Sequence, residues 1–177
     1  MGAVGTTDRV VLLDGLRTTR DAFVAGVAGI TDLQGKYKPE PDRWSIEECA
    51  EHLALVEKGI LQRLTQEATP SEHVENLERQ AQLRKSGADR TSKRQAPERT
   101  RPSGQFGSLK NALEQFAANR EKTIEYLSCC QEDLHARTIV HPLATMTCHE
   151  YVVFMTGHTL RHIEQIREIQ QTSGYPA

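Results

Sequence analysis

Residues 147–171 read TCHEYVVFMTGHTLRHIEQIREIQQ, and this stretch decides how the chain is expected to fold. Thr147 followed three residues later by Glu150 is a capping-box signature, which predicts that a helix begins there. A glycine and a proline close behind residue 171 end that helix. Two histidines, His158 and His162, stand four residues apart inside its apolar pattern, where core residues are expected.

The rotation of about 100° per residue places both histidine rings on the core-facing side of this helix. His158 lies about 40° from His162. Four apolar or aromatic residues lie within about 40° of the same line: Tyr151, Met155, Ile166 and Ile169. A buried imidazole needs hydrogen-bond partners or a metal ion. The pair is therefore either a satisfied core pair or two ligands presented to one ion.

A third ligand would decide between these readings, and His52 is the candidate. Ser45 and Glu48 form another capping box, which predicts a helix with His52 in its middle. Three histidines from two helices would leave at least one position of an ion open, as in catalytic sites. Surface or capping roles are expected for the remaining four histidines: His73, His135, His141 and His149.

Four stretches carry helical spacing, and no convincing strand alternation appears. The expected helices span about residues 7–30, 45–64, 108–127 and 147–171. Four amphipathic helices of about 20 residues predict an all-α four-helix bundle, with residues 1–177 as a single domain.

Between the second and third helices, residues 79–101 lose their periodicity and become basic. The basic residues are Arg79, Arg84, Lys85, Arg90, Lys93, Arg94, Arg99 and Arg101. A long crossover loop and a nucleic-acid-binding arm are the two interpretations. Nucleic acid ranks last among the partners, because aromatic residues for base stacking are missing from the segment.

Composition narrows the class of protein. The 177 residues are 37% hydrophobic and 26% charged with a formal net charge of −2, which is typical of a soluble globular domain. No apolar run approaches the roughly 20 residues that cross a bilayer, so no membrane partner is expected. The four cysteines form no C-x-x-C pattern, and we expect small buried thiols in a reducing cytoplasm. They are Cys49, Cys129, Cys130 and Cys148.

Two arginines interrupt apolar stripes. Arg120 lies on the apolar side of the third helix, between Phe116 and Ile124, and Arg20 is placed similarly on the first helix. A long arginine stem can cover apolar surface while its head reaches water. The alternative is a guanidinium aimed into an interior pocket, where it holds an anionic substrate or a carboxylate.

Four segments together resemble the DinB-like superfamily of metal-binding four-helix bundles. They are PEPDRWSIEECAEHLALVE, RQAPERTRPSGQF, LEQFAANREKTIEYL and HPLATMTCHEYVVFMTGHTLRHIEQI. The resemblance implies an up-down-down-up bundle with a long crossover between helices two and three, often as a homodimer. It implies that His52, His158 and His162 bind one divalent ion, commonly zinc or nickel. The arginine of the family's F-x-x-x-R segment corresponds to Arg120, whereas HPLATM lacks a glycine that relatives often carry.

The resemblance leaves several functions open. The first possible function is that of a metal-dependent enzyme that acts on a small molecule, either a transferase that uses a low-molecular-weight thiol or a hydrolase. Arg120 would then anchor an anionic group, and Glu51 is the nominee for a general base in hydrolysis. The alternative is a non-catalytic, metal-stabilised module that binds a ligand or serves a stress response.

Overall fold

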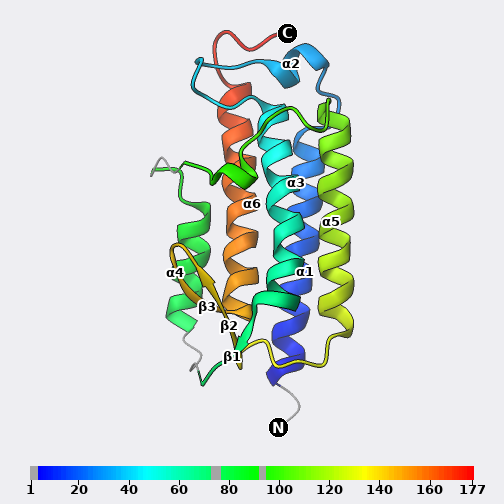
Figure 1. Ribbon diagram of the computed structural model, residues 1–177. Coiled ribbons are helices and arrows are strands. Elements are labelled where there is room, and N and C mark those ends of the chain that lie inside the picture. Colours follow the sequence, from blue (N-terminus) through cyan, green and yellow to red (C-terminus); the bar gives the residue numbers. More distant parts are fainter. Residues whose placement is uncertain (1–3, 73–76, 92–94) are drawn as a thin grey trace.

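Four long helices form the body of the protein in the computed structural model, which describes residues 4–72, 77–91 and 95–177 (Figure 1). They are α1 (Val4–Gly26), α3 (Ile46–Gln62), α5 (Leu109–Cys129) and α6 (Cys148–Gln170). The shorter helical elements are α2 (Asp32–Lys36), η1 (Arg63–Glu67), α4 (Leu77–Ala88) and η2 (Glu98–Thr100). Three short strands complete the fold: β1 (Thr69–Pro70), β2 (Arg137–His141) and β3 (Ala144–Thr147).

The order of directions is up-down-down-up. In Figure 1, α1 rises from the N-terminus, α3 and α5 both descend, and α6 rises beside them. Because α3 and α5 run the same way, the chain between them must return along the whole bundle, and α4 and η2 lie on that return. The expected four-helix bundle with a long crossover is confirmed. No helix of the described residues is long and apolar enough to cross a bilayer.

Local capping determines where three of the four long helices begin. The Ser45 hydroxyl accepts from the Glu48 N–H while the Glu48 carboxylate accepts from the Ser45 N–H. Thr147 and Glu150 repeat this capping box at α6, and Ser108 caps α5 alone. These bonds satisfy backbone N–H groups that the first turn of a helix leaves without partners. The starts predicted from the sequence are confirmed.

The core consists of two apolar clusters stacked along the bundle. The first holds Leu12, Leu16, Ile60, Leu64, Ile124, Leu127, Tyr151 and Met155 among others. The second includes Phe23, Val27, Ile46, Leu53, Phe116, Ile163 and Ile166. Each long helix contributes to both clusters, so its apolar stripe is buried over its length.

Three short strands, for which the sequence showed no convincing alternation, add a small sheet to the expected helical bundle. β2 and β3 pair antiparallel, with Ile139 opposite Met146 and a two-residue loop between them, and β1 pairs with β2. Strands of two to five residues are too short for alternation to stand out in the sequence. The hairpin lies along the side of the bundle, next to α4 and the first part of α6 (Figure 1).

The basic segment is not a continuous loop, because α4 lies within it and packs along α6. Two glycines meet where these helices touch. A Cβ atom on Gly87 would lie 2.6 Å from the Phe154 carbonyl oxygen, and one on Gly157 would lie 2.4 Å from that of Arg84. The contact is backbone against backbone, so α4 needs no apolar stripe of its own. The helical pattern was invisible in the sequence for that reason.

Candidate metal centre

Three histidines from two helices meet inside the bundle. His52 comes from the middle of α3, and His158 and His162 lie one turn apart on α6. The His158 Nε2 lies 3.4 Å from the His52 Nε2 and 3.3 Å from the His162 Nε2. His52 and His162 are buried, and His158 is partly exposed. The three rings form the one group of potential metal ligands among the described residues.

The ring of His52 is held in one tautomer. Its Nδ1 lies 2.7 Å from the Thr100 carbonyl oxygen, which can only accept, so Nδ1 carries the hydrogen. Burial lowers the pKa of His52 to about 4, which keeps the ring neutral near pH 7. A neutral ring with its hydrogen on Nδ1 has a lone pair on Nε2. That lone pair faces the other two histidines.

The pKa of the His162 ring is lowered as well. Burial, followed by the neighbouring His158 and His52 rings, lowers the pKa of His162 well below its ordinary value of 6.5. The site therefore disfavours protonated rings and favours the neutral imidazoles that metals bind.

The distances fit a tetrahedral ion. Zinc–nitrogen bonds of about 2.0–2.1 Å give nitrogen–nitrogen edges of about 3.3–3.4 Å in a regular tetrahedron. The two Nε2 separations at His158 are of that length. Hydrogen bonding is a poorer explanation, because a neutral His158 could donate from Nε2 to one of its two neighbours only. The three residues thus fit a divalent ion with a fourth corner left for another ligand.

Trp44 covers two of the rings. Its ring is stacked on His162, with centroids 6.1 Å apart and an interplanar angle of 16°, and its centroid lies 4.8 Å from that of His52. Trp44 directly precedes the Ser45 cap of α3, so the start of that helix positions it. The indole shields these rings from water and restricts their rotation.

Glu51 is not available as a general base. Its buried carboxylate accepts backbone N–H bonds from Ser103, Gly104 and Gln105 at 2.9, 2.9 and 3.2 Å. Burial alone would raise the pKa of Glu51, but these bonds outweigh burial and lower it. The nomination of Glu51 as the base is therefore wrong. The crossover segment uses this carboxylate instead.

Arg120 does not anchor a ligand in this structure. It is fully buried, and it donates from Nε and Nη2 to the two Glu57 carboxylate oxygens, both at 2.8 Å. Its other bonds go to the Leu16 carbonyl and the hydroxyls of Thr19 and Thr159, at 2.9–3.0 Å. A guanidinium has five N–H donors, so none remains for an anionic substrate. Arg120 therefore forms a structural ion pair with Glu57, which was the alternative to its expected role as an anion anchor.

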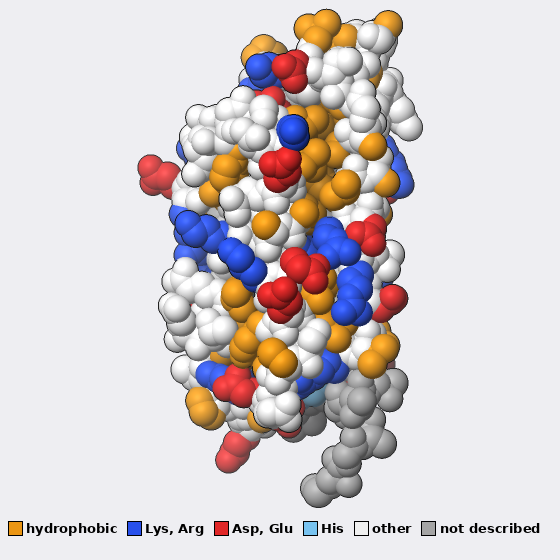
Figure 2. All heavy atoms as spheres, turned by 90° about the vertical axis from the view of Figure 1, so that its right-hand side faces the viewer, with side chains coloured by type: hydrophobic (Ala, Val, Ile, Leu, Met, Phe, Trp, Pro, Cys, Tyr) orange, Lys and Arg blue, Asp and Glu red, His pale blue; other side chains and the backbone are white. Residues whose placement is uncertain are grey.

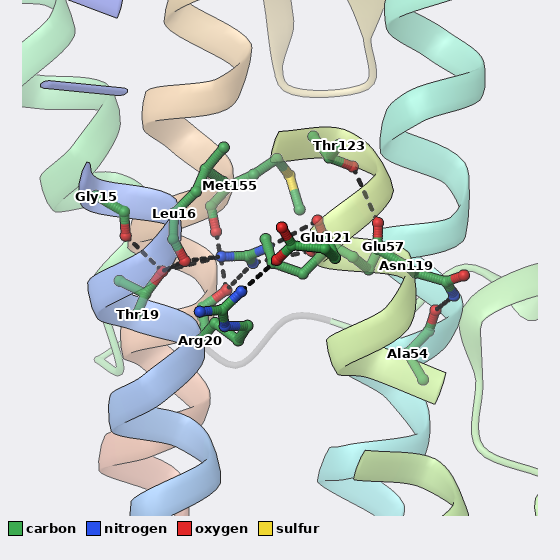
Figure 3. Close-up of polar contacts among 12 residues, drawn as sticks. Gly15, Leu16, Thr19, Arg20, Ala54, Glu57, Asn119, Glu121, Thr123 and Met155 are labelled. Atoms are coloured by element: carbon green, nitrogen blue, oxygen red, sulfur yellow. Dashed lines mark hydrogen bonds and ion pairs between the residues drawn. The ribbon is translucent and has the colours of Figure 1, made fainter. Parts of the chain in front are cut away.

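This network joins all four long helices between the two apolar clusters. Figure 3 shows Leu16 and Thr19 on α1 and Glu57 on α3. Arg120 belongs to α5 and Thr159 to α6. Along their helices, the polar members lie between a residue of one cluster and a residue of the other, and Leu16 belongs to the first cluster; the polar members are Thr19, Glu57, Arg120 and Thr159. A polar layer thus crosses the core and fixes how the helices register against one another.

Arg20, the other stripe-breaking arginine, lies at the surface. It pairs with Asp21 and with Glu121 of α5. The face on the right-hand side of Figure 1, drawn in Figure 2, carries acidic and basic side chains side by side among hydrophobic ones. Such a mixed face has no single-sign field.

Three other histidines, His135, His141 and His149, lie outside the metal centre. His149 is buried in the first turn of α6 and stacks on His135, with centroids 4.3 Å apart, so the expected surface role of His149 is wrong. The His141 Nδ1 accepts from the Leu143 N–H, which is a turn-capping role. His73 lies outside the described residues.

Basic residues of the crossover segment take part in the fold. Arg79 bonds to Glu150 and to the Thr145 carbonyl, which ties α4 to the start of α6. Arg90 bonds to Glu168 and Gln165 on α6. Lys93 and Arg94 lie outside the described residues. Some of the basic residues of this segment thus hold the crossover against α6.

A four-helix bundle with a buried cluster of three histidines defines a class of metal-binding helical proteins. The family model of the DinB superfamily matches residues 16–166, and the chain belongs to that superfamily. The uncharacterized protein YuaE of Bacillus subtilis (strain 168) is 25% identical over 144 residues, which cover 81% of this chain and 87% of YuaE.

A solved structure shares the fold. YfiT from Bacillus subtilis superposes with a TM-score of 0.63 at 15% identity, covering 99% of this chain and 93% of YfiT. That protein is described as a "probable metal-dependent hydrolase with an unusual four-helix bundle topology". At this identity the likeness shows the fold alone.

Proposed function

We propose that the protein is a metal-dependent enzyme acting on a small molecule, with His52, His158 and His162 as ligands of one divalent ion. The convergence of the three histidines carries this proposal, since the His158 Nε2 lies at tetrahedral spacing from both other Nε2 atoms and one ring nitrogen of each histidine lies within 4.8 Å of the others. Three protein ligands leave one corner for a substrate or water, which is typical of catalytic rather than structural sites. Zinc or nickel is the expected ion.

Thiol-dependent transfer is the reaction that the surroundings favour. When bound, the ion supplies a Lewis acid that lowers the pKa of a thiol or water in the open position. A thiol then needs no protein base, which suits a cluster that contains no carboxylate among the described residues. In such a transfer the thiol proton would pass to solvent, the sulfur would bond to an electrophilic carbon, and the leaving group would depart with the bonding electrons.

Hydrolysis is the second candidate, and the description of YfiT favours it. Water would occupy the corner that a thiol takes in transfer. Glu51 and Glu57 are both engaged in hydrogen bonds within the fold, so neither is free to accept a proton from that water. A hydrolase would have to activate water without these two carboxylates.

One experiment separates the candidates. Untagged protein loaded with zinc or nickel is incubated with a low-molecular-weight thiol and an alkyl halide, and in parallel with activated esters and amides without thiol. We expect a thioether product that requires the thiol and disappears in His158→Ala. Thiol-independent ester or amide cleavage would favour the hydrolase. Neither reaction from fully loaded protein would favour the non-catalytic ligand-binding module.

Two further proposals accompany this function. The homodimer implied by the family resemblance is tested by sedimentation equilibrium of the untagged chain. A reducing cytoplasm is the proposed location, which agrees with four cysteines that are all free in the structure.

A further inference from the structure

The crossover touches α3 at two consecutive residues, and one of them is a metal-centre histidine. Glu51 holds the backbone of residues 103–105, and His52 bonds to the Thr100 carbonyl. The His52 contact joins α3 to the last residue of η2, and the Glu51 contacts join α3 to the stretch that follows η2. Only two residues, Arg101 and Pro102, separate Thr100 from Ser103, so the position of the Thr100 carbonyl constrains that of the Ser103 N–H.

The Glu51 contact is a backbone nest around a carboxylate. The N–H groups of Ser103 and Gln105 point at Oε1, and the N–H of Gly104 points at Oε2. Consecutive N–H groups converge in this way when one residue takes a left-handed conformation, and Gly104 has φ 79°. Glycine adopts this conformation without the strain that a Cβ would bring.

The Thr100 contact determines how His52 can act. With Nδ1–H donating to that carbonyl, the lone pair of His52 lies on Nε2, 3.4 Å from the His158 Nε2. A hydrogen on Nε2 would instead block this atom as a ligand. A bond from a ring N–H to a carbonyl is the usual means by which proteins fix a ligating histidine.

We propose that Glu51 is a positioning residue for the metal centre: by clamping residues 103–105 onto α3, its carboxylate holds the Thr100 carbonyl against His52 and so keeps Nε2 ready to bind. This inference rests on the proposed metal site, because the role that it assigns to Glu51 is to position the metal ligand His52. The proposal also explains why the Glu51 carboxylate is buried at this position. A carboxylate that only stabilised the fold would not need to sit beside a ligand.

Glu57 provides a matched control on the same helix. Both carboxylates are buried to the same degree, with 2% of each residue exposed, but the Glu57 carboxylate pairs with Arg120 of α5, whereas the Glu51 carboxylate binds the backbone of the crossover. Loss of either charge perturbs stability. Only the loss of Glu51 should change the state of the His52 ring.

The test compares Glu51→Gln with Glu57→Gln through two measurements. Nitrogen-15 NMR of the metal-free protein gives the tautomer of His52, and competition with a chromophoric chelator gives the dissociation constant for Zn²⁺. In Glu51→Gln an amide nitrogen replaces an acceptor of the nest. We expect His52 to lose its single Nδ1–H tautomer and the zinc dissociation constant to rise about 10–100-fold. Glu57→Gln should keep the wild-type tautomer.

A second pair of variants keeps the test valid if Glu51→Gln does not fold. Gly104→Ala strains the nest from the exposed crossover side, and Gly29→Ala introduces the same strain at φ 76° in the turn after α1. Neither Cβ would meet another atom within 4 Å. Gly104→Ala should shift the His52 tautomer and weaken zinc binding, and Gly29→Ala should do neither.

The assignment would be overturned if Glu51→Gln and Gly104→Ala both kept the wild-type tautomer of His52 and the wild-type affinity for zinc. Equal zinc loss in Glu51→Gln and Glu57→Gln, with unchanged tautomers, would overturn it too, since that result indicates general destabilisation. Failure of the proposed function is a different result, in which the wild-type protein binds no zinc. The tautomer measurement still tests the link from Glu51 to His52 in that case.

Discussion

Arg120→Met should destabilise the protein strongly, because it leaves the Glu57 carboxylate buried without its partner. Arg120 is 0% exposed and Glu57 2%, and two of the five guanidinium bonds go to that carboxylate. Breaking a buried pair on one side typically costs about 3–5 kcal/mol. For a chain of this length, each kcal/mol lowers Tm by about 2–4 °C, so we expect a fall of roughly 6–20 °C.

The double variant Arg120→Met/Glu57→Leu should recover most of that loss. Replacing a whole buried ion pair by apolar side chains is often neutral or stabilising. Urea unfolding of the wild type, both single variants and the double variant gives the coupling energy directly. The reasoning is refuted if Arg120→Met unfolds within about 1 kcal/mol of the wild type, or if the two single effects simply add.

Two other perturbations have defined outcomes. Burial lowers the pKa of His52 from 6.5 to about 4, so between these values the unfolded chain binds a proton that the folded one does not. Stability of the metal-free protein should therefore fall as pH drops from about 6.5 to 4.5, by roughly 2–3 kcal/mol from His52, and His52→Phe should flatten that slope in urea titrations. Gly157→Ala should cost about 1–3 kcal/mol and raise hydrogen exchange in α4, because its Cβ would lie 2.4 Å from the Arg84 carbonyl oxygen. Gly59→Ala, with no atom within 4 Å, should be neutral or stabilising, and a similar loss there would remove the packing explanation.

Features that depend on nearby residues could be predicted from the sequence. The capping boxes at Ser45 and Thr147 join residues three positions apart, so they are legible without tertiary information. The spacing of His158 and His162 placed both rings on one face by helix geometry alone. His52 lies more than 100 residues away; its place in a predicted helix made it the candidate third ligand, and the family resemblance assigned all three histidines to one ion.

Features that depend on contacts between distant segments could not be predicted from the sequence. Helix geometry indicated that Arg120 faces inward, but not that Glu57 neutralises it rather than a substrate. α4 packs through Gly87 and Gly157, and a backbone contact leaves no hydrophobic periodicity to read. The binding of the Glu51 carboxylate by residues 103–105 is likewise set by the conformation of the crossover.

Metal analysis of untagged protein tests the central claim most directly. Elemental analysis is performed on the wild type and on His52→Ala, His158→Ala and His162→Ala, with circular dichroism to verify that each variant folds. The convergence of the three Nε2 atoms predicts about one divalent ion per chain in the wild type and loss of most of it in every variant. A full metal load in all three variants, or an ion present only when an affinity tag is attached, would contradict the assignment.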